Sequence, residues 1–264
     1  MKFLRKIIFS IISISIVILF FVFFGVQKVE LKGKEKFVLY VKNRNYSVSN
    51  LVVVKDPITL KHTTGRIAGL ADMSILINEG VLYINGKNED NDKVLLPYRV
   101  NCFTKEAEDS LLNKYTNLDK NELRVYYLLL TNNELQELEE DSMFLIKKDI
   151  IPSGFGQNYI FPNSYNYNWN KDYFGILKIP RKNYTIKLNS KTYSMYRITI
   201  ENFEQSKIEK KGTDFFINNK KITSYTFMNN YVFILNDNRT NIDDSRKWGP
   251  IPENYIIGKI LFSL

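Results

Sequence analysis

The strongest constraint on the fold is an uncharged apolar run, Ile7 to Val26, close to the amino terminus. As a helix it would be about 30 Å long, which matches the hydrocarbon thickness of a bilayer. The serines inside the run can bond back to helix carbonyls, so they do not prevent insertion. The run therefore predicts one N-terminal transmembrane helix, with residues 1–27 as an N-terminal tip and membrane anchor.

A cleaved secretory signal is the competing interpretation of this run. Its apolar core would be about 7 to 15 residues long and would precede a cleavage site between small residues, and the chain has neither feature. A retained anchor is therefore expected. Lysines and arginines flank the run on both sides, at 2–6 and at 28–36, so charge alone does not decide its orientation.

Downstream of the run, short apolar segments alternate with turn residues, which is typical of strands. Aromatic residues make up 14% of the chain, and flat rings suit half-buried pleated surfaces. The fold class is therefore predicted to be mainly β. Thr131 followed by Glu134 has the form of a capping box and predicts a helix start. The predicted strands are residues 37–41, 51–54, 65–70, 74–77, 81–86, 123–130, 184–188, 196–200, 214–218 and 231–235.

Charge and composition exclude several classes of function. The net charge is +9, but no nucleic-acid motif is present, and anionic lipid headgroups are the nearer acidic partner of an anchored domain. Cys102 is the single cysteine and His62 the single histidine, so no internal disulfide and no pattern with metal-ligand spacing exists. We expect a membrane partner, no nucleic acid, no metal and no cofactor. His62 is interpreted as a loop residue.

The C-terminal part carries a dense motif: Asn-Asp-Asn-Arg at 236–239, Asp-Ser-Arg at 244–246, Trp-Gly at 248–249 and Ile-Gly-Lys at 257–259. This spacing resembles the last conserved box of the type I signal peptidases, also called leader peptidases. Residues 65–72, 81–87 and 169–180 are similar to further elements of the long-insert form of that family.

The resemblance implies a fold, a domain order and a location. The fold is a signal-peptidase-like antiparallel β domain with an inserted α+β subdomain, preceded by the transmembrane helix. Residues 28–93 and 181–264 would form the two parts of the β core, and residues 94–180 the inserted subdomain. The protein would cross the plasma (inner) membrane once, with its C-terminal domain on the extracytoplasmic side.

The resemblance also implies a chemistry, that of a serine endopeptidase with a Ser/Lys dyad. In that family a serine just past the anchor attacks the peptide carbonyl, and a desolvated lysine acts as the general base. Here the serine position falls near Gln27 and the lysine position is Gly65. A supporting serine of the family is replaced by Ile242, and a glycine of the box by Asn236. The dyad cannot be placed, so enzymatic activity stays open.

Substitutes for the dyad are available only at other positions. Lys61 lies four residues before Gly65, which is about 13 Å along a strand. Ser47 and Ser49 fall in a predicted loop, where serine is common for turn chemistry. The remaining box residues are interpreted as scaffold whose charges pair to tie strand ends together. They are Asp237, Asn238, Arg239, Asp244, Ser245 and Arg246, with Arg66 beside the lysine position.

The expected function is therefore that of a membrane-anchored protein of the signal peptidase I family, related to signal peptide processing. It would be a degenerate, non-catalytic paralogue that binds preproteins or a partner, such as an active signal peptidase. Peptide binding is expected by strand addition along Phe37–Val41, Leu51–Val54 and Ile75–Ile84. The alternative is an active signal peptidase I with a relocated nucleophile.

Overall fold

The computed structural model describes residues 15, 22–31, 34–42, 45–115 and 118–263. Among these residues, no helix is both long and apolar enough to cross a membrane. The predicted span, Ile7 to Val26, falls almost entirely on residues 1–14 and 16–21, outside the described part. Its last three residues, from Phe24 onward, already belong to a strand, so the predicted helix extended too far at that end.

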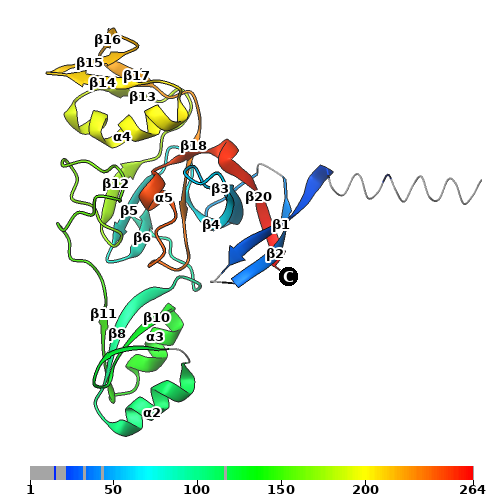
Figure 1. The fold of residues 1–264 in the computed structure, drawn as a ribbon, viewed down its shortest axis with the longest axis vertical. Coiled ribbons are helices and arrows are strands. Elements are labelled where there is room, and N and C mark those ends of the chain that lie inside the picture. Colours follow the sequence, from blue (N-terminus) through cyan, green and yellow to red (C-terminus); the bar gives the residue numbers. More distant parts are fainter. Residues whose placement is uncertain (1–14, 16–21, 32–33, 43–44, 116–117, 264) are drawn as a thin grey trace, which may run out of the picture. The chain divides into compact units, whose positions relative to one another are not determined.

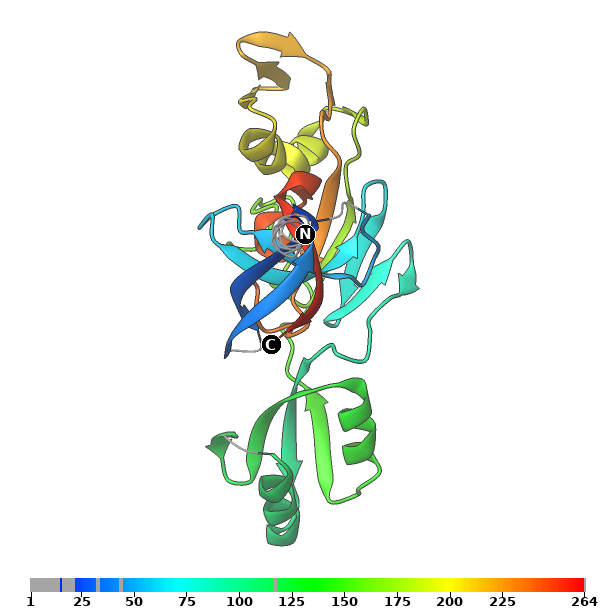
Figure 2. The ribbon, with the colours of Figure 1, turned by 90° about the vertical axis from the view of Figure 1, so that its right-hand side faces the viewer.

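The described chain divides into two compact units, the first from residues of 1–67 and 253–264 and the second from Ala68–Pro252. Antiparallel strands form the first unit in the order β1-β2-β20-β3-β4, and Figures 1 and 2 show the β1–β2 hairpin beside β20. A 3-10 turn, η1 (Glu253–Tyr255), leads into β20. The strands are β1 (Phe24–Leu31), β2 (Lys34–Val41), β3 (Leu51–Lys55), β4 (His62–Gly69) and β20 (Ile256–Ser263).

The core of the first unit follows from strand alternation. Side chains at every second position of a strand point to the same face. Val29 of β1 and both Val38 and Tyr40 of β2 share one face, and they pack with Val53 and Ile260. Removing such β-branched side chains from water is the main favourable term in folding. The sequence pattern at 37–41 and 51–54 predicted these two strands correctly.

The second unit is built from small antiparallel sheets, which confirms the prediction of a mainly β, antiparallel fold. The strand orders are β12-β5-β6-β7, β11-β8-β10-β9, β14-β15-β16, β13-β17 and the pair β18-β19. Their bounds are β5 (Ser74–Asn78), β6 (Val81–Ile84), β7 (Lys87–Asn88), β8 (Leu96–Cys102), β9 (Asp119–Glu122), β10 (Val125–Leu130), β11 (Phe144–Lys148), β12 (Phe174–Lys178), β13 (Thr185–Lys187), β14 (Ile208–Lys211), β15 (Asp214–Ile217), β16 (Lys220–Ile222), β17 (Ser224–Thr226), β18 (Tyr231–Leu235) and β19 (Ile251–Pro252).

Two helices, α2 (Lys105–Lys114) and α3 (Asn132–Glu139), lie on the sheet β11-β8-β10-β9 (Figure 1). Leu111 and Leu138 enter a core with Val100, Tyr126 and Leu128 of the sheet. The predicted capping box is confirmed, because the Thr131 side chain accepts from the Glu134 N–H and the Glu134 carboxylate accepts from the Thr131 N–H. The predicted domain boundaries after residues 27, 93 and 180 stay predictions.

One predicted strand is a helix instead. Residues 196–200 alternate apolar and polar side chains, but they lie inside α4 (Ser190–Phe203). Asn189 caps this helix, and the Thr192 side chain bonds back to the Asn189 N–H. Tyr196 and Ile200, four residues apart, are buried on one face. The apolar positions of this segment fit the period of a strand as well as that of a helix. The N-terminal cap and the burial of one helical face favour the helix.

Glu204 at the C-terminal end of α4 is buried and ties the helix to the following strands. Its carboxylate accepts hydrogen bonds from the hydroxyls of Tyr225, at 2.9 Å, and Tyr231, at 2.7 Å. The Met228 N–H and the Asn229 side-chain amide also donate to it. A buried carboxylate is tolerated only when hydrogen bonds replace its lost hydration, and these four donors supply them.

High pH is expected to destabilise the second unit through these tyrosines. Burial, and then the hydrogen bond to Glu204, raises the pKa of Tyr225 and of Tyr231, whereas an unfolded tyrosine titrates near pH 10. Above about pH 10 the unfolded chain binds fewer protons than the folded chain, so the free energy of unfolding falls, by up to about 1.4 kcal/mol per pH unit for each tyrosine. Urea unfolding between about pH 9 and about pH 11 measures this slope.

The slope should be shallower in Tyr231→Phe, because that variant lacks one of the tyrosines whose pKa is raised by burial. Tyr165→Phe is the matched control, since the Tyr165 side chain is fully exposed, and it should keep the wild-type slope. Identical slopes in the wild type and in Tyr231→Phe would show that the buried hydroxyl does not carry the effect.

Candidate functional site

The predicted site residues fall in both units. Gln27, Gly65 and Arg66 belong to the first unit, and the motif at 236–246 belongs to the second. Each group is described within its own unit.

Gln27 lies on β1 opposite Val38 and is partly buried. Its Oε1 is 3.0 Å from Nδ1 of His62, and its Nε2 donates to the Lys28 carbonyl. His62 is exposed and begins β4, so its interpretation as a loop residue was wrong; the strand pairs it with Lys55. The single histidine of the chain therefore contacts an amide, which is neither a nucleophile nor the orienting carboxylate of a catalytic triad.

Gly65, which the resemblance predicts at the family's lysine position, is a buried residue of β4 that pairs with Val52. Without a side chain it provides no group that could accept a proton. The neighbouring Arg66 donates from its guanidinium to the Ser49 carbonyl at 2.6 Å. Arg66 thus holds the chain between β2 and β3 against β4.

Ser47 and Ser49 lie in that connection, as the sequence predicted for a loop, and both are exposed. Ser49 has a φ of 68° and donates its N–H to the Ile67 carbonyl, while the Ser47 N–H donates to the Asn50 side chain. Among the hydrogen bonds that the structure describes, none joins either hydroxyl to a lysine or a histidine. The backbone conformation and hydrogen bonds of Ser47 and Ser49 are those of a turn, where serine is common.

A serine and a lysine do meet elsewhere, in the second unit. Nζ of Lys210 on β14 donates to Oγ of Ser190 at the start of α4, at 3.0 Å. Both residues are exposed. A lysine base must lose its proton through desolvation, and nothing desolvates an exposed ammonium. This surface pair lacks the burial that a lysine general base requires.

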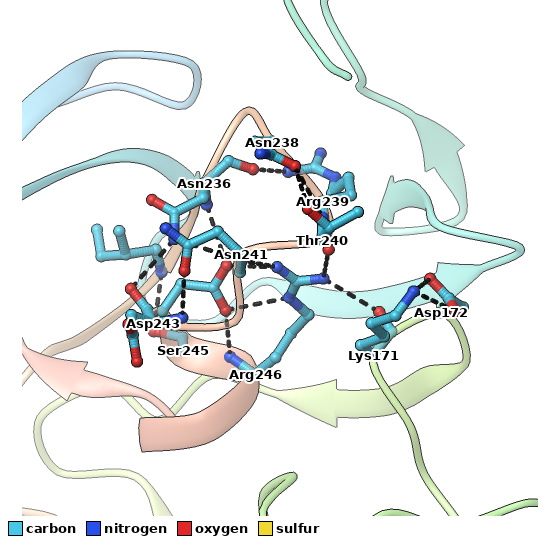
Figure 3. Close-up of polar contacts among 12 residues, drawn as sticks. Lys171, Asp172, Asn236, Asn238, Arg239, Thr240, Asn241, Asp243, Ser245 and Arg246 are labelled. Carbon is cyan, nitrogen blue, oxygen red and sulfur yellow. Dashed lines mark hydrogen bonds and ion pairs between the residues drawn. The ribbon is translucent and has the colours of Figure 1, made fainter. Parts of the chain in front are cut away.

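The motif at 236–246 folds around the N-terminus of the short helix α5 (Ser245–Trp248) (Figure 3). Asp244 caps this helix, and its carboxylate accepts from the Arg246 N–H at 2.9 Å and from the Asn236 N–H at 3.1 Å. Ser245 Oγ accepts from the Ile234 N–H of β18 at 2.9 Å. These bonds fix the end of β18 to the start of α5.

Arg246 is fully buried, and every donor of its guanidinium has a protein acceptor. Nε and one terminal nitrogen bind the Asp244 carboxylate as a fork, at 3.1 and 2.7 Å. The remaining donors reach three backbone carbonyls, those of Lys171, Arg239 and Asn241. A planar guanidinium has five N–H donors, so none is left for a substrate.

Arg239, also buried, pairs with a partner that the sequence analysis did not identify. Its guanidinium binds the carboxylate of Asp90 and donates to the Asn236 carbonyl at 2.6 Å. Burial lowers the pKa of Arg239 below its usual range, and the Asp90 carboxylate opposes this effect. Asp90 lies 149 positions away in the sequence, in a polar stretch that gives no local signal for the pairing.

The other motif residues hold the backbone. The Asp237 carbonyl accepts from the Leu95 N–H, and the Asn238 side chain accepts from the N–H and hydroxyl of Thr240. Ile242 is partly buried and its carbonyl accepts from the Asp244 N–H.

Asn236, which the resemblance predicts in place of a family glycine, does not have a positive φ. Its side-chain amide bridges to the Asp243 carbonyl at 3.2 Å. An L-residue fits here without backbone strain, and its amide adds a contact that glycine could not make.

A buried ion pair supports the same region. Lys171 Nζ lies 2.7 Å from the Asp172 carboxylate, which also accepts from the Ile151 N–H. The Lys171 carbonyl in turn accepts from Arg246. The charges of the motif are therefore used to join chain segments. In the part of the chain that the structure describes, no three His, Cys, Asp or Glu side chains gather as possible metal ligands.

Residues 178–264, which include the whole motif, match the family described as signal peptidase, peptidase S26. This C-terminal part of the chain is therefore similar to the signal peptidases. No curated protein matches its sequence.

The match to the signal peptidases reaches from the last residue of β12 through β20. It contains Ile242 and the scaffold residues, whereas Gln27, Gly65 and Arg66 lie outside it. The family is one of proteases, so the recognition predicted from the sequence is confirmed. The absence of the dyad stays a prediction from the sequence.

Proposed function

We propose that this protein is a non-catalytic member of the signal peptidase family that binds apolar segments of preproteins. The observation that carries the proposal is the chemistry of the residues where the resemblance would put the dyad, near Gln27 and at Gly65. Gln27 presents an amide that is hydrogen-bonded to His62, and Gly65 has no side chain. Neither can attack a carbonyl or accept a proton. Ser47, Ser49 and the exposed Ser190–Lys210 pair supply no desolvated base.

Topology argues against strand addition along the three segments named from the sequence. β2 lies between β1 and β20, β3 between β20 and β4, and β5 between β12 and β6. Each is hydrogen-bonded on both sides, and an added peptide strand needs an unpaired edge. Their apolar side chains are explained by the cores they form.

The outer face of β1, β2 and β20 is the better candidate for binding. Val26, Leu39 and Phe262 are direct neighbours across the three strands and share one face, and Phe37 lies two residues from Leu39 on the same side. Val26, Phe37 and Phe262 are each about half exposed, at 50%, 52% and 51%. We call these four residues the apolar face. Contiguous exposed apolar surface of this kind is typical of interaction sites.

The location fits this role. The uncharged run Ile7 to Val26 leads directly into β1, so a membrane-inserted run would keep the apolar face close to the bilayer. Signal peptides carry an apolar core of about 7 to 15 residues that passes through the same zone. The proposed topology is a single crossing of the plasma (inner) membrane, with the described units on the extracytoplasmic side.

Titration of a labelled signal-peptide analogue against the full chain in lipid nanodiscs tests the binding. We expect sub-millimolar affinity, and about tenfold weaker binding in Phe37→Asp and in Phe262→Asp, because each loses the burial of a phenyl ring. Phe155→Asp is the matched control, since Phe155 is an exposed phenylalanine of the second unit. Equal affinity of all variants would reject the apolar face. If no binding were detected up to the solubility limit, the remaining interpretation would be that this protein is a partner subunit of another signal peptidase.

A further inference from the structure

The long connection between β11 and β12 contains a cleft. Residues 149–173 have no helix or strand, and connections longer than about 15 residues are usually functional or disordered. Backbone hydrogen bonds hold this connection in place. The Gln157 N–H donates to the Trp169 carbonyl at 2.9 Å, and the Phe161 N–H donates to the Arg246 carbonyl at 2.8 Å. Residues 156–168 line a cleft of about 350 Å³, within the range of small-ligand sites.

Uncommitted side-chain amides surround this cleft. Asn158, Asn163 and Asn168 line it, and among the hydrogen bonds that the structure describes none involves their side chains. Asn170, just outside, behaves differently. Its amide donates to two carbonyls and accepts from two N–H groups, so it is a structural residue. The three lining amides keep their donors and acceptors available.

Two tyrosines complete the lining, one fixed and one exposed. The Tyr167 ring lies 4.9 Å from the Trp169 ring, which packs against the buried Phe174 at 4.6 Å. The Tyr167 hydroxyl donates to the Lys191 carbonyl at 3.1 Å. The Tyr165 side chain is fully exposed at the cleft. The site thus has one aromatic wall anchored to the core and one exposed aromatic ring.

The chemistry of the lining selects the ligand. No Lys, Arg, Asp or Glu lines the cleft, although the protein has a net charge of +9. Anionic ligands therefore find no counter-charge there. An extended peptide would need the regular backbone donors and acceptors of a strand, which this segment lacks.

Amides offer both donors and acceptors, which match the hydroxyls of a sugar, and tyrosine rings offer flat surfaces for the apolar C–H face of a pyranose. We propose that residues 156–168 form a binding site for a neutral saccharide.

Titration of the full chain with neutral trisaccharides tests this site. Chitotriose, cellotriose and maltotriose are the probes, followed by calorimetry and by the fluorescence of Trp169, whose ring contacts the Tyr167 wall. We expect at least one of them to bind with a Kd below about 10 mM. Tyr165→Ala should weaken binding at least about tenfold, and Asn158→Ala and Asn168→Ala about threefold to tenfold each. Tyr165 and both asparagines are exposed, so these variants should fold.

Phe155→Ala is the control, because Phe155 is an exposed aromatic residue of the same connection that does not line the cleft. It should bind like the wild type. Three results would overturn the proposal: no neutral trisaccharide binding, equal weakening in Phe155→Ala and Tyr165→Ala, or tighter binding of trigalacturonate or of a neutral Ala/Ser tetrapeptide with the same dependence on the variants.

Discussion

Replacing Arg246 with alanine is expected to destabilise the second unit by about 3 to 5 kcal/mol, the usual effect of removing one partner of a buried ion pair. The substitution would leave the Asp244 carboxylate buried without its counter-charge. It would also leave the carbonyls of Lys171, Arg239 and Asn241 without the donors that now reach them. Urea unfolding followed by the fluorescence of Trp248, two residues away, measures the loss.

The neighbouring residue provides the control for this prediction. Lys247 pairs with Asp243 at 2.8 Å, but the Asp243 carboxylate is exposed and Lys247 is only partly buried, so Lys247→Ala should change the unfolding free energy by less than about 1 kcal/mol. The loss of unfolding free energy in Arg246→Lys should lie between those of Arg246→Ala and Lys247→Ala, because an ammonium has three donors and the guanidinium has five. If Arg246→Ala and Lys247→Ala unfolded at the same urea concentration, the motif would not be the scaffold described above.

The purified full chain is expected to cleave no preprotein at a measurable rate. Loss of the nucleophile or the base of a catalytic unit typically lowers the rate on the order of 10⁶-fold. The resemblance puts the nucleophile near Gln27 and the base at Gly65, and neither residue has the required group. The assay would incubate a preprotein with the chain in nanodiscs and identify products by mass spectrometry, beside a signal peptidase with an intact dyad as positive control.

Cleavage would refute the non-catalytic assignment, and variants would then locate the nucleophile. Loss of the product with Ser47→Ala or Ser49→Ala would favour a nucleophile relocated to the loop between β2 and β3. Loss with Ser190→Ala would point to the pair with Lys210. Ser142→Ala, outside all of these places, is the matched control and should leave any product unchanged.

The sequence by itself determined the class of the fold and the family. Alternating apolar residues at 51–54 and 74–77 predicted strands, because the period of two buries one face of a pleated chain. The spacing of the motif at 236–249 pointed to the signal peptidases, and the family match at 178–264 agrees. These are local signals, carried by neighbouring residues.

Only the tertiary structure decided how the distant charges pair and which strands are internal. Arg239 binds Asp90, 149 positions away, because the fold brings two polar connections together at the end of β18. His62 meets Gln27 for a similar reason. The helix at 190–203 replaced an expected strand because its cap and its buried face outweighed a pattern that suited both periods. Such contacts join residues that are far apart in the chain, so no local periodicity encodes them.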